Sequence, residues 1–339
     1  MCKNRFDSYY DIRLATVEEI PAVMDFIGQY WKKGHILSRN REFFEYEMVI
    51  DSVVNFVVAV VKTTGEIDGI LGFLPCSNRK DKLDAWGVIW KTKNDALPML
   101  GIELKKRFCA ITGVRNDLGV GANVETSVPL LGRILHFYTA KMKHFYRLCD
   151  KASYTVAKVA HKDIVSYTPS NGLEIIALPM AEDLENFFDF PENALPYKNF
   201  WYYNRRFYNH PIYKYQLWGA FDGKTKAIFV TRVQQCQDTA IISIVDYAGE
   251  ATLFSQCGSF FDKILKDNGY EFIDFYFDGF PEEYVKSAGF VELEKDDTNI
   301  IPTYFNPFVL SNVDIYVDAS NKKDKFTFFK ADGDQDRPN

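Results

Sequence analysis

Several patterns that would mark common protein classes are missing or scarce in this sequence. No stretch of the 339 residues approaches eighteen uninterrupted apolar residues, the length that a membrane-crossing helix needs. Lys and Arg number 40 against 46 Asp and Glu, and the resulting net charge of −6 argues against a nucleic-acid binder, which needs a basic surplus. We therefore expect a protein without transmembrane segments that binds small molecules.

Paired cysteines are also lacking. The six cysteines are scattered, with no CxxC pair and no histidine at ligand spacing, so neither a zinc site nor a disulfide framework is indicated. The first twenty residues carry charges where a signal peptide would need an apolar core. We expect reduced thiols, no bound metal and a cytoplasmic location.

Core-forming residues, in contrast, are plentiful. Hydrophobic residues make up 47% of the chain and aromatic residues 16%. A length of 339 residues exceeds the size at which single cores tend to divide, so two domains are expected. Turn-forming residues cluster near 165–172, and we predict one domain over 1–168 and a second over 169–339.

Hydrophobic periodicity and turn residues predict the elements of each half. The first half reads as a strand at 9–16, helices at 17–31 and 40–49, a hairpin at 55–76, a strand at 86–90, a helix at about 98–107 and a strand at 108–114. The second half reads as a hairpin at 215–234, a strand at 240–248, a helix at 252–269, a strand at 271–279 and a short helix with a strand at 281–293. Because the later elements repeat the order of the earlier ones, we predict an internal duplication.

This order, twice over, resembles the acyl-CoA N-acyltransferase (GNAT) superfamily. The string "YVKSAGF" is similar to that family's Y-x-K-x-G-F ending, with one extra residue. The strings "GHILSRNREFFEYEM", "IPTYFNPF" and "FKADGDQDRPN" are similar to tandem GNAT proteins of bacterial surface-polysaccharide synthesis, some of which acylate dTDP-linked amino-dideoxy sugars. The resemblance implies a mixed α/β fold with two tandem GNAT-like domains, the second a degenerate copy.

The resemblance also implies where coenzyme A binds. In the family, the loop and helix after the fourth strand receive the pyrophosphate, and a helix start suits an anion because it presents free N–H groups and the positive end of the helix dipole. The family's glycine-rich motif is reduced here to Gly101, with Met99 or Glu103 in place of the other glycine, and an ordinary solvated connection is the alternative. The implied coenzyme A contacts are Ile89, Trp90, Lys91, Lys93, Met99, Gly101 and Asn123.

The equivalent loop of the second half is acidic, since it contains Asp246 and Glu250. A carboxylate beside a diphosphate is repulsive by about a kcal/mol or more. We therefore assign acyl-CoA to the first half and expect the second half to contribute to the acceptor site, in a cleft between the domains.

Residues 199–218, "NFWYYNRRFYNHPIYKYQLW", interleave aromatic rings with two arginines and a histidine. Such a mixture suits a nucleotide diphosphate and a stacked base. An amphipathic helix whose rings are simply core is the alternative. The candidate acceptor-binding residues are Trp86, Tyr203, Arg205, Arg206, His210 and Tyr213.

The chemistry implied is transfer of a short acyl group, such as acetyl or 3-hydroxybutanoyl, to the amine of a dTDP-linked amino sugar. An amine that titrates near 7.7 to 8.0 is partly neutral at pH 7, so a weak base suffices. His35, Asp84 and Asp246 are the candidates, each with a structural alternative, and protonation of the thiolate is unassigned. A Fem-type aminoacyl transferase and a non-catalytic ligand-binding protein are the rival hypotheses.

Carboxylates at the C-terminus, in "DGDQD" from Asp332 to Asp336, are spaced as in a calcium loop. The glycine that such a loop requires at its sixth position and the distal glutamate are missing. We therefore expect a flexible or docked acidic tail there.

Overall fold

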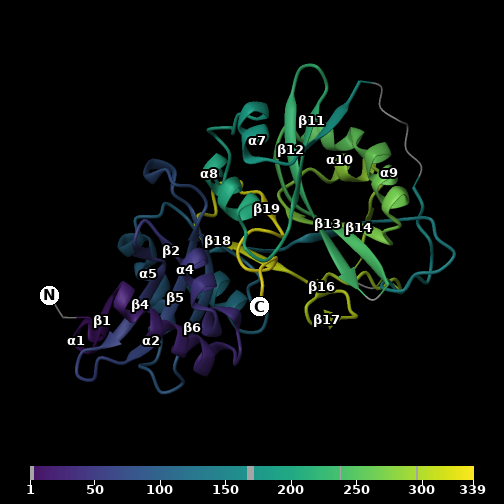
Figure 1. The fold of residues 1–339 in the computed structure, drawn as a ribbon. Helices are drawn as coiled ribbons and strands as arrows, with labels where there is room; N and C mark the ends of the chain where they lie inside the picture. Colours follow the sequence, from purple (N-terminus) through teal and green to yellow (C-terminus); the bar gives the residue numbers. More distant parts are fainter. Residues whose placement is uncertain (1–3, 166–171, 237, 295–296) are drawn as a thin grey trace. The chain divides into compact units, whose positions relative to one another are not determined.

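The computed structural model describes residues 4–165, 172–236, 238–294 and 297–339. The chain divides into two compact units (Figure 1). The first unit contains the residues up to Thr139 together with Tyr316–Asp324 and Arg337–Asn339, and the second contains Ala140–Ile315 and Lys325–Asp336.

The first unit is built on a seven-stranded mixed sheet of order β1-β4-β5-β6-β7-β18-β8. Its strands are β1 (Tyr10–Leu14), β4 (Phe56–Val61), β5 (Ile67–Pro75), β6 (Ala85–Thr92), β7 (Asp117–Val120), β18 (Tyr316–Ala319) and β8 (Tyr138–Lys141), and a separate pair is β2 (Val49–Ile50) and β3 (Val53–Val54). Its helices and helical turns are α1 (Arg5–Tyr9), η1 (Val17–Glu19), α2 (Ile20–Phe26), η2 (Ile27–Trp31), α3 (Ile36–Arg39), α4 (Arg41–Met48), η3 (Lys80–Lys82), α5 (Leu100–Thr112), α6 (Ser127–Pro129) and η4 (Leu130–Ile134).

Both faces of this sheet are covered, which explains why β4 is apolar and buried throughout. On one face Val57 and Ala59 pack in a cluster with Leu104 of α5. On the other face Phe56 stacks on Phe44 of α4, with ring centroids 5.7 Å apart. The predicted strands, helices and hairpin up to β6 are confirmed.

The predicted strand at 108–114 is wrong, because these residues extend helix α5. Leu100, Leu104 and Phe108 recur at helical spacing and are buried together. The helix ends at Gly113, whose φ of 76° gives the left-handed C-cap that glycine favours. The strand follows at β7.

The second unit contains an eight-stranded sheet of order β10-β11-β12-β13-β14-β9-β15, with β19 paired to β14. Its strands are β9 (Lys143–Leu148), β10 (Glu174–Leu178), β11 (Gln216–Phe221), β12 (Lys226–Cys236), β13 (Thr239–Gly249), β14 (Phe272–Asp278), β15 (Val291–Glu292) and β19 (Phe328–Phe329), with a separate pair β16 (Tyr304–Phe305) and β17 (Phe308–Val309). Its helices and turns are α7 (Ala181–Phe187), α8 (Phe200–Tyr203), η5 (Asn204–Tyr208), η6 (Ala251–Gln256), α9 (Gly258–Asn268) and α10 (Glu282–Ser287).

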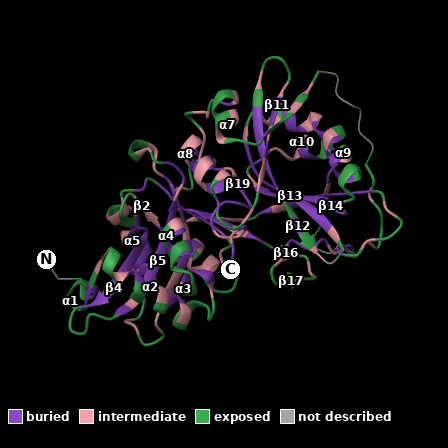
Figure 2. Ribbon diagram, in the orientation of Figure 1, coloured by how far each residue is buried: buried purple, intermediate pink, exposed green. Residues whose placement is uncertain are grey.

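The elements of the second half follow the predicted order, and the strand order of the second sheet repeats that of the first. The strands of both sheets are largely buried (Figure 2). Aromatic rings dominate the core of the second unit, where Phe254, Phe261 and Phe275 are fully buried. In the part of the chain that the structure describes, no helix combines the length and apolarity needed to cross a membrane.

The two units divide differently from the predicted boundary between residues 168 and 169. Most of the turn cluster used for that prediction, 166–171, lies outside the described residues. Strand β9 precedes the predicted boundary, yet it lies between β14 and β15 in the second sheet. Strand β18 comes from the C-terminal part of the chain, yet it pairs with β7 in the first sheet. Each sheet thus takes one strand from the other half of the sequence.

Candidate functional site

Strand β6 contains an irregularity where the resemblance implies contact with a thioester. Between Gly87 and Trp90, β6 advances by three residues while its partner β5 advances by two. Val88 and Ile89 therefore lie together opposite Gly72. Two residues opposite one form a β-bulge, which increases local twist and redirects the groups that follow.

Hydrogen bonds on either side of the bulge show which way Trp90 faces. The Ala85 N–H donates to the Asn116 carbonyl (3.1 Å), on the β7 side, whereas the Lys93 N–H donates to the Asp68 carbonyl (2.8 Å), on the β5 side. Bonding direction alternates along a strand, and the extra residue of the bulge shifts that alternation by one. The backbone N–H of Trp90 therefore points to the side of β7.

Strand β7 no longer accompanies β6 at that point. The two strands are parallel neighbours from Ala85 to Gly87 on β6 and from Asp117 to Gly119 on β7, and no later pair joins them among the described residues. Strand β6 continues to Thr92. We call this opening between β6 and β7 the first splay, and the pair Gly87–Gly119 its vertex.

The first turn of α5 follows the end of β6 and its loop. Met99, directly before the helix, has a left-handed φ of 73° and is 49% exposed. This conformation costs a side chain about 1 to 2 kcal/mol and is normally met by glycine. Gly101 lies against β6, because its carbonyl accepts a hydrogen bond from the Trp90 indole (3.0 Å) and a Cβ there would lie 3.2 Å from Trp90 Nε1.

The two lysines of the loop differ in their surroundings. Lys93 pairs with Asp68 (3.1 Å) and Glu66 (3.2 Å), and its side chain is only 14% exposed. Lys91 is half-buried, and no described residue forms an ion pair with it. Lys91 is therefore the better placed of the two to meet an added anion.

A buried charged cluster that sequence analysis missed lies at the vertex of the first splay. Lys105 of α5 contacts both oxygens of Asp117 on β7 (2.7 and 2.8 Å), and all three of Lys105, Asp117 and Asp318 are buried. The glycines make room for it: a Cβ on Gly87 would lie 3.1 Å from Lys105 Nζ, and one on Gly119 would lie 2.1 Å from Asp318 Oδ2. No local signal could identify this cluster, because its members come from three distant segments.

His35, a predicted base, serves as the N-cap of α3. Its Nδ1 accepts a hydrogen bond from the Leu37 N–H (3.2 Å). Burial, with the nearby charges of Lys32 and Arg39, lowers the pKa of His35 to about 4. The imidazole is therefore neutral at pH 7, and its catalytic role stays a prediction.

Asp84, the second predicted base, is completely buried at the start of β6. Its carboxylate accepts hydrogen bonds from Arg115 Nη2 (2.8 Å) and from the Asn116 amide (2.8 Å). These contacts fix the beginning of β6 against the segment that leads into β7. They give Asp84 a structural role, which is the alternative that the sequence left open.

Trp86 and Asn123 also have roles within the fold. Trp86, predicted to meet the acceptor, is fully buried in β6. Asn123, implied as a coenzyme A contact, accepts hydrogen bonds from the backbone N–H groups of Glu125 (2.9 Å) and Thr126 (3.0 Å). It thereby closes the turn before α6.

The corresponding opening in the second unit is filled by the chain itself. Among the described residues, β13 and β14 pair from Ile242 to Ile244 on β13 and no further, and the β12–β13 register shifts just beyond that point, at Val245. Strand β19 pairs with β14 at Phe329, and the Ala331 N–H donates to the Val245 carbonyl (2.9 Å). We call this opening between β13 and β14 the second splay. The C-terminal segment Phe328–Asp336 thus lies where a ligand would enter it.

Asp246, the third predicted base, helps to hold this C-terminal segment. It is completely buried and contacts Lys198 Nζ (2.8 Å) and the Tyr203 hydroxyl (3.1 Å). Lys198 in turn pairs with Asp332 (2.6 Å). The acidic tail is therefore docked, and Asp246 is buried beneath it.

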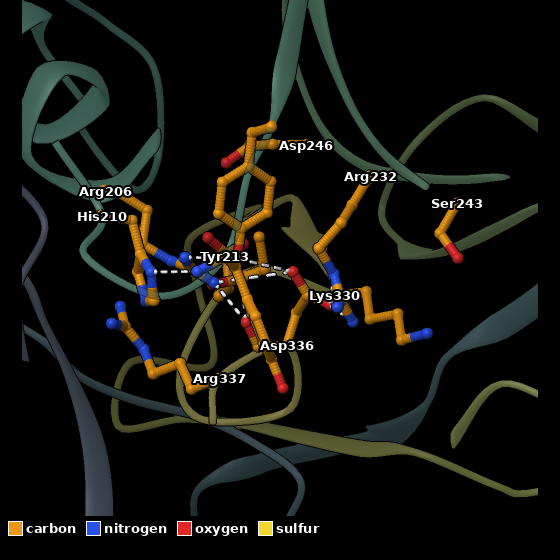
Figure 3. A network of polar contacts seen from close by, with 12 residues as sticks. Arg206, His210, Tyr213, Arg232, Ser243, Asp246, Lys330, Asp336 and Arg337 are labelled. Carbon is orange, nitrogen blue, oxygen red and sulfur yellow. Dashed lines mark hydrogen bonds and ion pairs between the residues drawn. The ribbon is translucent and has the colours of Figure 1, made fainter. Parts of the chain in front are cut away.

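The arginines of the aromatic segment contribute to the same docking. Figure 3 shows Arg206 and Arg232 directed toward Asp336. Arg206 Nη2 donates to the Asp336 carbonyl (2.7 Å), Arg232 Nη2 lies 2.6 Å from Asp336 Oδ1, and the Tyr215 hydroxyl donates to Oδ2 (2.9 Å). Arg206 is therefore already bound to a partner within the protein. Arg205 of the same turn is half-buried.

His210 and Tyr213 complete this network. His210 is buried and its Nδ1 accepts hydrogen bonds from the backbone N–H groups of Ile212 (3.2 Å) and Tyr213 (2.9 Å). The Arg232 guanidinium lies 4.2 Å from the Tyr213 ring centroid. Nucleotide binding by this segment stays a prediction, and its observed contacts are those of a structural core.

A pocket of about 240 Å³ remains in the second unit, beside the docked segment. Aromatic rings of Phe190, Tyr247 and Phe280 line it. The predicted acceptor residue Tyr203 also reaches its wall, and Lys325 lies at its edge, exposed. The pocket is chiefly apolar, with cationic side chains near it.

Comparison with known proteins identifies the fold. No family model and no curated protein matches the chain. A GCN5-related N-acetyltransferase from Anabaena variabilis is similar in structure, with a TM-score of 0.54 and 10% identity over 92% of this chain and 73% of that one. A conserved protein of unknown function from Enterococcus faecalis, described as a probable N-acyltransferase, has a TM-score of 0.50 and 11% identity over 91% and 72% of the two chains. The predicted mixed α/β fold of the GNAT type is confirmed.

Proposed function

We propose that this protein is an acyl-CoA-dependent N-acyltransferase whose donor site lies in the first unit. The observation that carries the proposal is the β-bulge at Val88–Ile89 followed by the first splay. An open strand edge offers backbone N–H groups to an extended ligand. The N–H of Trp90 would donate to the thioester carbonyl and stabilise the oxyanion that forms there.

The start of α5 would bind the pyrophosphate of coenzyme A. Its free N–H groups and helix dipole attract an anion, and Lys91 on β6 adds a positive charge. The left-handed Met99 supports this assignment, because the family motif places a glycine in that region. The second unit is not a competing donor site, since Phe328–Asp336 fills the corresponding opening.

The acceptor that we propose is a nucleotide-linked amino sugar, with acetyl or a short hydroxyacyl group as the transferred unit. The resemblance to surface-polysaccharide enzymes motivates this choice. In the second unit the pocket lined by Phe190, Tyr247 and Phe280 offers rings for a base, and Lys325 at its edge could meet a phosphate. Acylation of the sugar amine would give an amide.

Calorimetric titration with coenzyme A tests the donor assignment. The change Lys91→Glu should weaken binding about tenfold or more, because it replaces attraction to the diphosphate with repulsion. Lys106→Glu, an equal charge change at an exposed position of α5, is the matched control and should bind as the unaltered protein does. Absence of coenzyme A binding by the unaltered protein would refute the proposal.

A second titration, with dTDP in the presence of saturating coenzyme A, tests the acceptor. Binding of both ligands together is expected, and Lys325→Glu should weaken dTDP while leaving coenzyme A unaffected. Displacement of coenzyme A by dTDP would instead mean that the two share a site. That result would contradict the proposal that the acceptor is linked to a nucleotide.

One observation favours a non-catalytic ligand-binding protein as the second candidate. Of the two lysines expected to bind the diphosphate, Lys91 and Lys93, the second already forms ion pairs with Asp68 and Glu66. Binding of coenzyme A without release of free thiol from acyl-CoA, for any amino sugar supplied, would support this candidate.

A further inference from the structure

We propose that Asp318 is the group that takes the proton from the attacking amine and returns it to the departing sulfur. The inference rests on the proposed acyl transfer and deepens it. Asp318 was not a candidate from the sequence, since it lies on β18, far along the chain from the donor loop. Strand exchange brings it to the first sheet.

The position of Asp318 is set by its neighbours at the vertex of the first splay. Strand β18 pairs with β7 so that Asp318 lies beside Gly119, and Gly119 pairs with Gly87 of β6. The bulge begins at the next residue, Val88. Because both strands carry glycine here, charged side chains fill the space over the vertex: a Cβ on Gly87 would lie 3.3 Å from Asp117 Oδ1, and one on Gly119 would meet the Asp318 carboxylate.

Asp318 is buried but incompletely bonded. It is 3% exposed, and its Oδ1 has no hydrogen-bond partner among the described residues. A buried carboxylate oxygen without a donor is costly, so in a purely structural cluster we would expect it to be paired. This unpaired oxygen, on the strand that adjoins β7 at the vertex, has the free lone pairs that a proton acceptor requires.

Burial and the surrounding charges bring the pKa of the Asp318 carboxyl close to neutral pH. Burial raises its pKa, the Lys105 ammonium of α5 opposes this rise and Asp117 of β7 adds to it, so that the pKa is about 7. One turn along α5 lies the Cys109 thiol, whose own pKa is raised to about 11. On its other side β18 adjoins β8, which carries Tyr138. A group that titrates near the working pH is the most effective general acid and base.

The proton balance follows from this placement. The neutral amine attacks the thioester carbon, forming a C–N bond and a tetrahedral intermediate with positive charge on nitrogen. The Asp318 carboxylate takes a proton from that nitrogen. The C–S bond then breaks, and the Asp318 carboxyl gives the same proton to the thiolate. The amide and the free thiol result, and Asp318 returns to its initial state; the proton lost by the ammonium before attack goes to water.

Kinetics of Asp318→Asn provide the first test. The substitution keeps the shape but cannot hold the proton, so kcat should fall about 100-fold with the KM for acyl-CoA nearly unchanged. The matched control Asp324→Asn, an exposed position of the same stretch Tyr316–Asp324, should behave as the unaltered protein. Formate should partly restore the activity of Asp318→Ala. Unaltered kcat in a folded Asp318→Asn protein, or lack of formate rescue, would overturn the inference.

Direct titration provides a readout that does not need activity. In protein labelled with ¹³C at aspartate carboxyls, a signal that titrates near 7 should be missing from Asp318→Asn, whereas the signal of Asp332, whose pKa burial also raises to about 7, should remain. Titration near the ordinary value of about 3.9 would overturn the assignment of the proton to Asp318. If the protein binds no coenzyme A, the proposed function fails whatever Asp318 does. If the unaltered enzyme acylates an amine and Asp318→Asn matches it, only the inference fails.

Discussion

Separating the chain at the predicted boundary should prevent both halves from folding alone. A fragment of residues 1–168 would carry β9 without β14 and β15, and would lack β18. The complementary fragment, 169–339, would have the opposite defects. This outcome follows from the strand exchange, because two independent tandem domains would each survive the cut.

The expected loss can be estimated from burial. In β9, Phe145, Tyr146 and Leu148 are at most 3% exposed. Each buried side chain of this size contributes about 1.5 to 3 kcal/mol, so these three account for about 5 to 9 kcal/mol. Loss of buried Val317 from β18 adds about 1.5 to 3 kcal/mol to the first fragment's deficit. Whole domains are stable by only about 5 to 15 kcal/mol, so neither fragment should retain a cooperative fold.

Thermal melts by circular dichroism, together with gel filtration, can test this. Each fragment alone should melt without a cooperative transition, whereas co-expression of both should recover a complex with the mass and melt of the full chain. A matched pair divided at 139/140 should also need both pieces, because residues 316–324 remain on the other one. A monomeric, cooperatively melting fragment 1–168 would refute the strand exchange.

Three further substitutions test other parts of the structure. Met99→Gly should stabilise the protein by about 1 kcal/mol in urea unfolding by relieving the left-handed backbone, and a loss of stability would contradict that conformation. Asp336→Ala should cost about 3 to 5 kcal/mol of unfolding free energy, since it leaves buried Arg206 and half-buried Arg232 without their carboxylate, and an unchanged unfolding midpoint would count against the docked tail. The raised pKa of Asp318 means that the native state holds a proton more tightly than the unfolded chain does. Between pH 4 and 7 the free energy of unfolding of the unaltered protein should therefore fall by up to about 4 kcal/mol relative to that of Asp318→Asn. Stability curves that run parallel over this pH range would exclude the shift.

Local patterns were sufficient for the helices and hairpins that recur in the two halves of this fold. Strand β4 could be predicted because six consecutive apolar residues suit a central strand, and the turn at Gly65 marked its hairpin. The end of α5 was misplaced because Phe108 and Ile111 suit a strand as well as a helix. Only the helical spacing that buries Phe108 with Leu104, and the cap at Gly113, resolve the difference.

Pairing between distant segments was beyond local reasoning. Strand β9 was not among the predicted elements, and its residues after Lys143 are all buried, so they carry no alternation that could indicate its sheet. For the same reason Asp318 was not associated with Lys105, which precedes it by more than two hundred residues. Residue types alone likewise could not show that Arg206 is already paired within the protein, since an arginine suits Asp336 as well as a diphosphate.

The measurement that tests the central claim most directly is an NMR titration of ¹⁵N-labelled protein with an acyl-CoA analogue whose thioester sulfur is replaced by methylene. Saturable shifts are predicted for the backbone amide of Trp90 and for those of Leu100 to Glu103, with no comparable change at Tyr247 to Ala251 in the second unit. Shifts confined to the second unit, or none at β6 and α5, would contradict the assignment of the acyl donor to the first splay.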